Sequence, residues 1–269
     1  MALLEIEGLV VRFGGLTALD GISLAVEAGE FVSVIGPNGA GKTTLFNVIA
    51  GAQAPSGGDV RLDGRSIRGL GPTRMSHRGV ARTFQVARPF RSLSLRDNVR
   101  LAAAGPHTLT TLRTLGTRGG SGASSRRADD LLALTGLLPK ADEPAAKLNI
   151  GELRRLELAR ALAGGPRLLL LDEPAAGIGA DGMRPLADLI AETRARGVTI
   201  LLVEHHVGFA LSLCDRAVVL DAGRIIAQGT AEAVRNDPAV VAAYLGRGSA
   251  LARSAAAAAA SAPTGGAGA

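Results

Sequence analysis

The feature that most constrains this 269-residue chain is a strand, a glycine-rich turn and a helix in succession between residues 31 and 50. The apolar run FVSVI leads into GPNGAGKTT and then into LFNVIA. Gly36, Gly41, Lys42 and Thr43 fit the spacing G-x-x-x-x-G-K-[ST], which is typical of a phosphate-binding loop. Glycines let backbone N–H groups close around phosphate oxygens, and the following helix presents its positive end to them. The stretch therefore predicts a nucleotide site.

Residues within this turn have separate expected roles. Lys42 would add a positive charge for the outer phosphates, and the Thr43 hydroxyl would be a ligand of a phosphate-bound Mg²⁺. The residues that we expect to hold the nucleotide are Gly36, Pro37, Asn38, Gly39, Ala40, Gly41, Lys42, Thr43 and Thr44.

The bulk composition is that of an ordinary globular protein, with 47% hydrophobic and 20% charged residues. No apolar run approaches the ~18 residues of a membrane-spanning helix, and the first residues alternate instead of resembling a signal peptide. The single cysteine, Cys214, excludes an internal disulfide framework. We therefore expect a cytoplasmic protein in which Cys214 is a buried structural thiol.

The positive charge is concentrated in one window. Residues 61–127 contain fourteen arginines and two acidic residues, although the net charge of the whole chain is only +6. A nucleic acid, a membrane headgroup surface or an acidic protein could bind such a window, and a solvated arginine-rich face is an equal alternative. With 3% aromatic residues and no Trp, the chain has almost no stacking platforms for single-stranded nucleic acid.

The residues before and after the phosphate loop favour short strands. Residues 3–12 alternate as a strand does, a turn at Gly14-Gly15 follows, and a second strand is expected around 22–26. Phe13, just before the turn, could stack on a purine base or plug the core. A turn over 55–59 then precedes a short hairpin that begins at Val60.

Residues 93–164 have helical character, interrupted by a flexible loop over 116–125. Asn149 is a plausible N-cap of the last helix in this region, with Glu152 three residues on as in a capping box. One apolar helix face is expected to end at Pro139 and to contain Leu131, Leu132, Leu134, Leu137 and Leu138.

Two acidic residues end a strand that the sequence predicts to be buried on both faces. The run RLLLLDE over 167–173 places Asp172 and Glu173 at the carboxyl end, where ligands bind in open parallel sheets. Adjacent acids are costly to bury there without a cation. Asp172 is suited to support Mg²⁺, and Glu173 is suited to deprotonate an attacking water.

The rest of the chain adds one further candidate. A helix over 181–196 leads to another buried strand, which ends at His205 on the same sheet edge, where a γ-phosphate or water contact is expected. A hairpin over 216–229 and a helix over 231–245 close the fold. Residues 247–269, rich in Ala, Gly and Ser, are expected to be a disordered tail.

Taken in order, these motifs resemble the nucleotide-binding subunit of an ATP-binding cassette transporter. The stretches RFGGLTAL, RTFQ, LDEPAAG, VEHH and NDPAVVAAYLG look most like the ATPase subunits of branched-chain amino-acid importers, and urea or amide importers look similar. The resemblance implies an α/β P-loop NTPase core with a mostly parallel sheet, an N-terminal antiparallel β subdomain and an inserted α-helical subdomain over about 87–165. One ATPase domain would span residues 1–246.

The resemblance also implies partners and roles. Two such subunits would sandwich two ATP molecules beneath transmembrane permeases, on the inner face of the membrane, with a solute-binding protein acting indirectly and no nucleic acid. Gln85 would sense the metal and water, Asp172 would support Mg²⁺, Glu173 would be the base, His205 the switch, and Phe13 would stack on adenine.

The departures from the family lie in the stretch that would reach the partner's γ-phosphate. The usual LSGGQ is replaced by LNIGE, so Asn149 and Gly151 remain as candidate contacts, while Glu152 places a negative charge near an anionic ligand. Gly179 stands where the family usually has an acid or Asn. We therefore hypothesise a heterodimer in which this chain completes the opposite site imperfectly. A soluble ATPase acting on ribosomes or DNA, and a module that binds nucleotide without turnover, are the competing interpretations.

Overall fold

The computed structural model describes residues 2–83, 89–104 and 122–245. Gln85, most of the predicted loop over 116–125 and the predicted tail over 247–269 lie outside the described residues.

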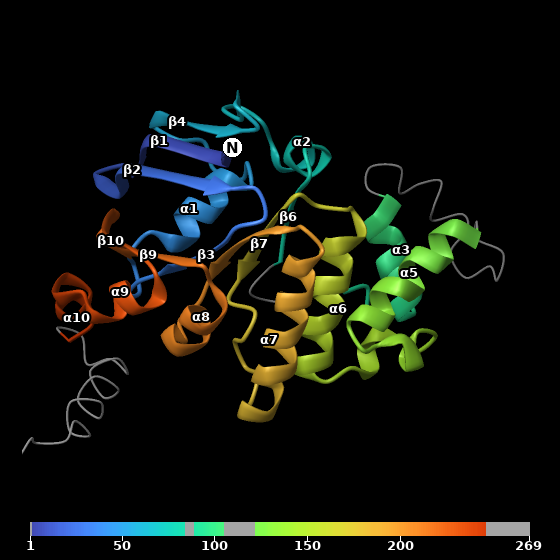
Figure 1. The fold of residues 1–269 in the computed structure, drawn as a ribbon. Helices are drawn as coiled ribbons and strands as arrows, with labels where there is room; N and C mark the ends of the chain where they lie inside the picture. The colour runs from blue at the N-terminus through green and yellow to red at the C-terminus, as the bar shows by residue number, and fades with distance from the viewer. Residues whose placement is uncertain (1, 84–88, 105–121, 246–269) are drawn as a thin grey trace, which may run out of the picture.

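A six-stranded sheet with the order β10-β9-β3-β8-β7-β6 forms the centre of the molecule (Figure 1). All neighbours run parallel except β9 and β10. Every residue of β3, β7 and β8 is buried, because both faces of the sheet are covered. The strands are β3 (Phe31–Ile35), β6 (Val80–Arg82), β7 (Leu168–Asp172), β8 (Thr199–Val203), β9 (Arg216–Asp221) and β10 (Arg224–Gly229).

A smaller antiparallel sheet covers one face of the first sheet, with α1 (Lys42–Ile49) between them (Figure 1). Leu9, Phe46 and Val34 belong to the apolar cluster that joins these three layers. The small sheet has the order β2-β1-β4-β5 and consists of β1 (Ala2–Phe13), β2 (Leu16–Glu27), β4 (Gly57–Leu62) and β5 (Arg65–Ser66).

Two predicted boundaries in this sheet are wrong. The second strand is longer than the expected 22–26, because residues from Leu16 onward pair with β1. The expected turn over 55–59 ends early, because β4 begins at Gly57, which pairs with Val10.

The other face is covered by α7 (Ala180–Ala195), α8 (Val207–Leu213), α9 (Ala231–Asn236) and α10 (Pro238–Leu245), and Leu158 and Leu162 of a further helix pack into the same cluster. The single helix predicted over 231–245 is therefore two helices. Asp237 has an extended backbone because the residue before a proline is disfavoured in the helical conformation. The break turns α10 so that its Tyr244 packs into the core of this face.

A third apolar cluster lies within the helices between β6 and β7, and includes Val99, Leu132 and Leu156. The predicted leucine face is wrong at its end, because α5 stops at Leu134 and Gly136 adopts a φ of 65°. Leu138 is consequently 41% exposed. The elements between β6 and β7 are α3 (Leu95–Ala104), α5 (Gly122–Leu134), two 3-10 turns over Leu138–Lys140 and Ala145–Lys147, and α6 (Ile150–Ala163). The short helix α2 (Pro72–His77) precedes β6.

Two bulk expectations can be compared with the structure. Within the described ranges, every helix is too short or too polar to cross a bilayer. Cys214 is half-buried rather than fully buried, and this burial raises the pKa of its thiol.

Candidate nucleotide site

The carboxyl ends of three parallel strands meet at one edge of the large sheet. Val34 of β3 pairs with Val203 of β8, which in turn pairs with Asp172 of β7. Because the three strands end in register, the phosphate loop, His205 and Glu173 all emerge at this edge, as the sequence predicted. The strand that carries His205 lies between the other two.

A cleft of about 630 Å³ opens at this edge. It is lined by the turn from Asn38 to Thr44 together with Glu173, His205 and Phe13. Phe13 is 47% exposed, so it does not plug the core. Its place on the cleft wall agrees with the stacking alternative.

Other residues that line the cleft were not predicted. They come from the start of β2 and from the turn between β9 and β10, and are Leu16, Thr17, Ala18, Ala222 and Gly223. This turn is bonded to the phosphate loop, since Gly223 N donates to Ala40 O over 3.1 Å. A pattern along the chain does not reveal it, because the contact joins residues far apart in sequence.

The phosphate loop requires glycine at two positions. A Cβ on Gly36 would lie 2.1 Å from the carbonyl oxygen of Leu220, and one on Gly41 would lie 2.7 Å from that of Ala18. Gly41 also has a φ of 103°, which disfavours other residues. The loop is thus pressed against the neighbouring backbone, which fixes where its N–H groups lie.

Lys42 is buried beneath this loop, with only 5% of its surface exposed. Its Nζ donates to the carbonyl oxygens of Gly36 and Pro37, at 2.7 and 2.9 Å. These two residues therefore hold the lysine rather than line the cleft. Burial lowers the pKa of Lys42, and the charges of Glu173 and Asp172 oppose that shift.

Glu173 and His205 are the two predicted catalytic residues that the structure describes, and their side chains contact each other directly. The Nε2 of His205 lies 2.6 Å from Oε1 of Glu173. Glu173 has a φ of 50°, which is rare for a residue with a side chain, and its N–H donates to Val203 O over 2.9 Å. The backbone is thus strained at the residue whose carboxylate faces the cleft, and such strain is often found at functional sites.

The buried carboxylate of Asp172 is expected to need a positive counter-charge. In the structure this charge comes from an arginine, Arg82. Arg82 Nη2 lies 2.7 Å from Asp172 Oδ2, and the side chains are 12% and 7% exposed. Arg82 Nη1 also donates to Asn47 of α1 over 2.7 Å. Sequence analysis did not identify Arg82 as a site residue. The only signal is its place at the end of a strand that pairs with β7.

Glu204 is a second residue that sequence analysis missed. It is 1% exposed, and its carboxylate accepts from the N–H of Ala175 at 2.8 Å and from that of His205 at 3.1 Å. Burial raises the pKa of Glu204, while these backbone donors oppose the shift. One buried carboxylate thus ties the segment after Glu173 to the segment that carries His205.

The residues present fit a magnesium ion bound together with phosphates. Thr43 is exposed and lines the cleft, whereas Asp172 ends β7 at the same sheet edge and does not itself line the cleft. In the described part of the chain, no group of three His, Cys, Asp or Glu residues could hold a metal. This agrees with a site in which Mg²⁺ takes few protein ligands and the phosphates supply the others.

The predicted signature contacts, Asn149 and Gly151, lie at the start of α6 and do not line the cleft. The predicted capping box is confirmed: Asn149 Oδ1 accepts from Glu152 N at 2.9 Å, and Glu152 Oε2 accepts from Asn149 N at 3.1 Å. Lys140 lies 2.7 Å from Glu152 and holds the pKa of that carboxyl below its usual value. The negative charge of Glu152 is therefore compensated, which weakens the Coulomb argument against this stretch.

Comparison with known proteins identifies the family. The sequence model described as ABC transporter matches residues 19–176, more than half of the chain. The chain belongs to the ABC transporter family. A second model, described as branched-chain amino acid ATP-binding cassette transporter, matches residues 224–250 of this ABC protein.

Curated relatives and solved structures agree with this assignment. BraF of Pseudomonas aeruginosa, a high-affinity branched-chain amino acid transport ATP-binding protein, is 42% identical over 91% of this chain and 98% of the relative. LivG of Escherichia coli, named likewise, is 41% identical over the same shares. The ADP conformation of MJ1267, an ATP-binding cassette of an ABC transporter, has a TM-score of 0.81 at 31% identity, covering 92% of this chain and 100% of that one.

These findings confirm the predicted family, the α/β fold and the class of ABC transporter ATPase, which binds nucleotide. The domain boundaries and the roles of individual site residues stay predictions.

Proposed function

We propose that this chain is the ATP-hydrolysing subunit of an importer for branched-chain amino acids. The observation that carries the proposal is the pairing of Glu173 with His205 at 2.6 Å on the wall of the phosphate-loop cleft. The solute class is supported by the match over residues 224–250 and by the names of BraF and LivG. The ATPase domain spans residues 1–246, and its helical subdomain spans about 87–165.

The mechanism follows from where the charges lie. The loop N–H groups bind the phosphates, and Lys42 exchanges the Gly36 and Pro37 carbonyls for the outer phosphates. Thr43 and Asp172 would hold Mg²⁺, which would neutralise phosphate charge. Phe13 stacks on the adenine from the cleft wall.

Glu173 is the general base in this mechanism. Its carboxylate accepts a proton from the attacking water, while His205 fixes its orientation through Nε2 and contacts the γ-phosphate. Gln85, which lies outside the described residues, senses the metal and the water.

A Glu173→Gln variant tests this proposal in the assembled transporter. We expect ATP turnover to fall at least about 100-fold, because a general base contributes that much to the rate, with nucleotide binding retained. Glu192→Gln is the control, since Glu192 is an exposed partner of Arg196 on α7. Unchanged turnover in the Glu173 variant would remove Glu173 as the base.

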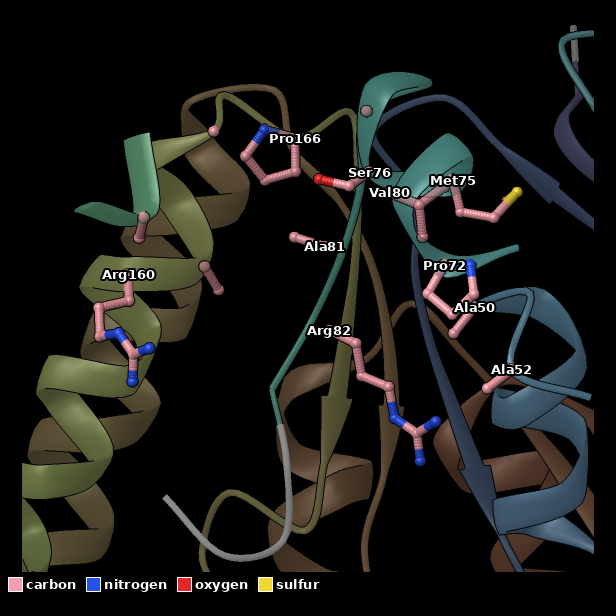
Figure 2. A pocket seen from close by; sticks show the side chains of 14 residues that line it. Ala50, Ala52, Pro72, Met75, Ser76, Val80, Ala81, Arg82, Arg160 and Pro166 are labelled. Carbon is pink, nitrogen blue, oxygen red and sulfur yellow. The ribbon is translucent and has the colours of Figure 1, made fainter. Parts of the chain in front are cut away.

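A second cavity, of about 330 Å³, is the proposed seat of a permease segment (Figure 2). It lies between the end of α1, α2, β6 and α6, and small residues such as Ala52, Ala81 and Ala161 leave room in it. Three exposed arginines of the basic window lie close to this face: Arg74 belongs to α2, and Arg65 and Arg68 line two neighbouring hollows. The ATPase would thereby sit peripherally on the inner face of the membrane.

Charge reversal tests this docking surface. Arg65→Glu, Arg68→Glu and Arg74→Glu together should reduce copurification with the permeases, whereas Arg194→Glu in the last turn of α7 with Arg196→Glu at its C-cap should not. If the first variant copurifies like the wild type, the arginine window is a solvated face.

The second ATPase subunit completes the site from the other side. Asn149 and Gly151 would contact the partner's nucleotide, and the departures at this stretch favour a heterodimer. The mass of the purified assembly decides this point, because two different ATPase chains give a mass that differs from that of two identical ones. A mass that matches two copies of this chain contradicts the heterodimer.

A further inference from the structure

Arg82 belongs to two sites at once. Its guanidinium bonds Asp172 and Asn47, both at 2.7 Å, at the nucleotide edge of the sheet. Its side chain also lines the 330 Å³ cavity, where Figure 2 shows it reaching from β6 away from Arg160. It therefore lies between the carboxylate expected to support Mg²⁺ and the cavity proposed to receive the permease.

The positive charge of Arg82 disfavours the binding of a second cation to the Asp172 carboxylate. A carboxylate that is 7% exposed is costly without a counter-charge, and Arg82 supplies one when no metal is bound. A divalent ion that approaches Asp172 meets this guanidinium in a poorly solvated place, where repulsion between like charges is strong. Arg82 thus stabilises the metal-free state and weakens metal binding.

We propose that Arg82 is a positioning residue that sets the Mg²⁺ concentration required by the nucleotide site and makes it respond to the permease segment proposed to fill the cavity. This inference rests on the proposed function, since it takes Asp172 as the metal-supporting carboxylate. An occupant of the cavity that touches Arg82 changes the balance between the bond of Arg82 to Asp172 and the contacts of Arg82 elsewhere. The affinity of the nucleotide site for Mg²⁺ changes as a result.

The test uses the full chain with saturating ADP and a titration of Mg²⁺, read as the rise in unfolding temperature. Arg82→Gln removes the charge, and we expect the Mg²⁺ midpoint to fall about tenfold, while Arg82→Lys, which keeps the charge, stays within about twofold of the wild type. Arg96→Gln is the matched control, because Arg96 forms a partly buried pair with Asp129 at 2.7 Å away from both sites.

The possible results separate the proposed role of Arg82 from the proposed ATPase function on which it rests. If the wild type shows no Mg²⁺-dependent stabilisation with ADP, the proposed function fails. Suppose instead that Mg²⁺ stabilises the wild type, but that the Mg²⁺ midpoint of Arg82→Gln is unchanged or higher. If this variant is then only less stable, as Arg96→Gln is, the ion pair between Arg82 and Asp172 has a structural role alone. A second measurement tests the link to the cavity. The Mg²⁺ midpoint of the wild type should differ between the assembled transporter and the isolated chain, whereas the midpoint of Arg82→Gln should be the same in both. Equal shifts in both would overturn the link to the cavity.

Discussion

The phosphate loop and the start of α6 both belong to motifs expected to bind ATP, but they are held in different ways. The loop is fixed by contacts from distant parts of the chain, including Gly223 beside it and the backbone of Leu220 against Gly36, and by its own Lys42 beneath it. The start of α6 is exposed, and its cap is formed by Asn149 and Glu152 within one helical turn. The difference teaches that the cleft side is shaped by the whole fold, whereas the signature side depends on local bonds.

The largest expected effect concerns the cleft side. Replacing Glu204 by Ala leaves the buried N–H of Ala175 and the partly buried N–H of His205 without their acceptor. We expect the free energy of unfolding to fall by about 3 kcal/mol, since each such donor costs about 1–3 kcal/mol. Urea denaturation measures this change, and Glu192→Ala on the surface of α7 should change it by less than about 0.5 kcal/mol. A Glu204 variant as stable as this control would show that the loops are held by other contacts.

Tyr244 of α10 is hydrogen-bonded to the backbone of Gly36 in the phosphate loop and gives a pH-dependent test. Burial raises the pKa of its hydroxyl to about 12, against an opposing hydrogen bond from the backbone of Gly36. Because the folded pKa is raised above the unfolded value near 10, this contribution to stability is present below about pH 10 and is lost as the pH rises toward 12.

We therefore expect stability to decline between about pH 10 and pH 12, by up to roughly 2–3 kcal/mol for two pKa units. Tyr244→Phe should flatten this decline, because it has no hydroxyl to titrate. Urea midpoints for both proteins at pH 8, 10 and 11 measure the difference. Parallel curves would mean that the tyrosine does not titrate in a buried state.

A smaller effect is expected at the cleft wall. Phe13→Ala should weaken ATP binding about tenfold, within the ~1–3 kcal/mol range for a base stacked on an aromatic ring. Phe90→Ala is the control, because Phe90 is 51% exposed and packs against Arg160 outside the cleft. A fluorescent nucleotide titration measures both. Equal affinities in the two variants would mean that Phe13 does not stack on the base.

The same contrast explains how much the sequence could predict. The buried runs of β3, β7 and β8 and the glycine spacing of the loop are local patterns, so the strands and the cleft residues from Asn38 to Thr44 could be predicted from them. The roles of Arg82 and Glu204 could not. Each depends on which strands become neighbours: Arg82 reaches Asp172 only because β6 pairs with β7, and Glu204 reaches Ala175 only because β8 lies beside β7.

Helix ends were harder to predict for a different reason. Leucine spacing suggested a face that extends to Leu138, but Gly136 and the tertiary contacts of Leu137 decide where α5 stops. The cap at Asn149 was predictable because its two hydrogen bonds join Asn149 and Glu152, which lie within four residues of sequence.

The smallest expected effect is on the signature side, where Asn149→Ala removes the side-chain acceptor for the N–H of Glu152. We expect the free energy of unfolding to fall by about 1 kcal/mol, as for other N-cap losses, and Asn149→Ser to retain most of that stability. The serine variant also restores the residue usual in the family. Its ATP turnover in the assembled transporter therefore separates two explanations for the LNIGE stretch. If turnover rises with unchanged stability, the asparagine limits the partner's site; if neither changes, the two residues are equivalent caps and the departure from the family pattern does not limit the reaction.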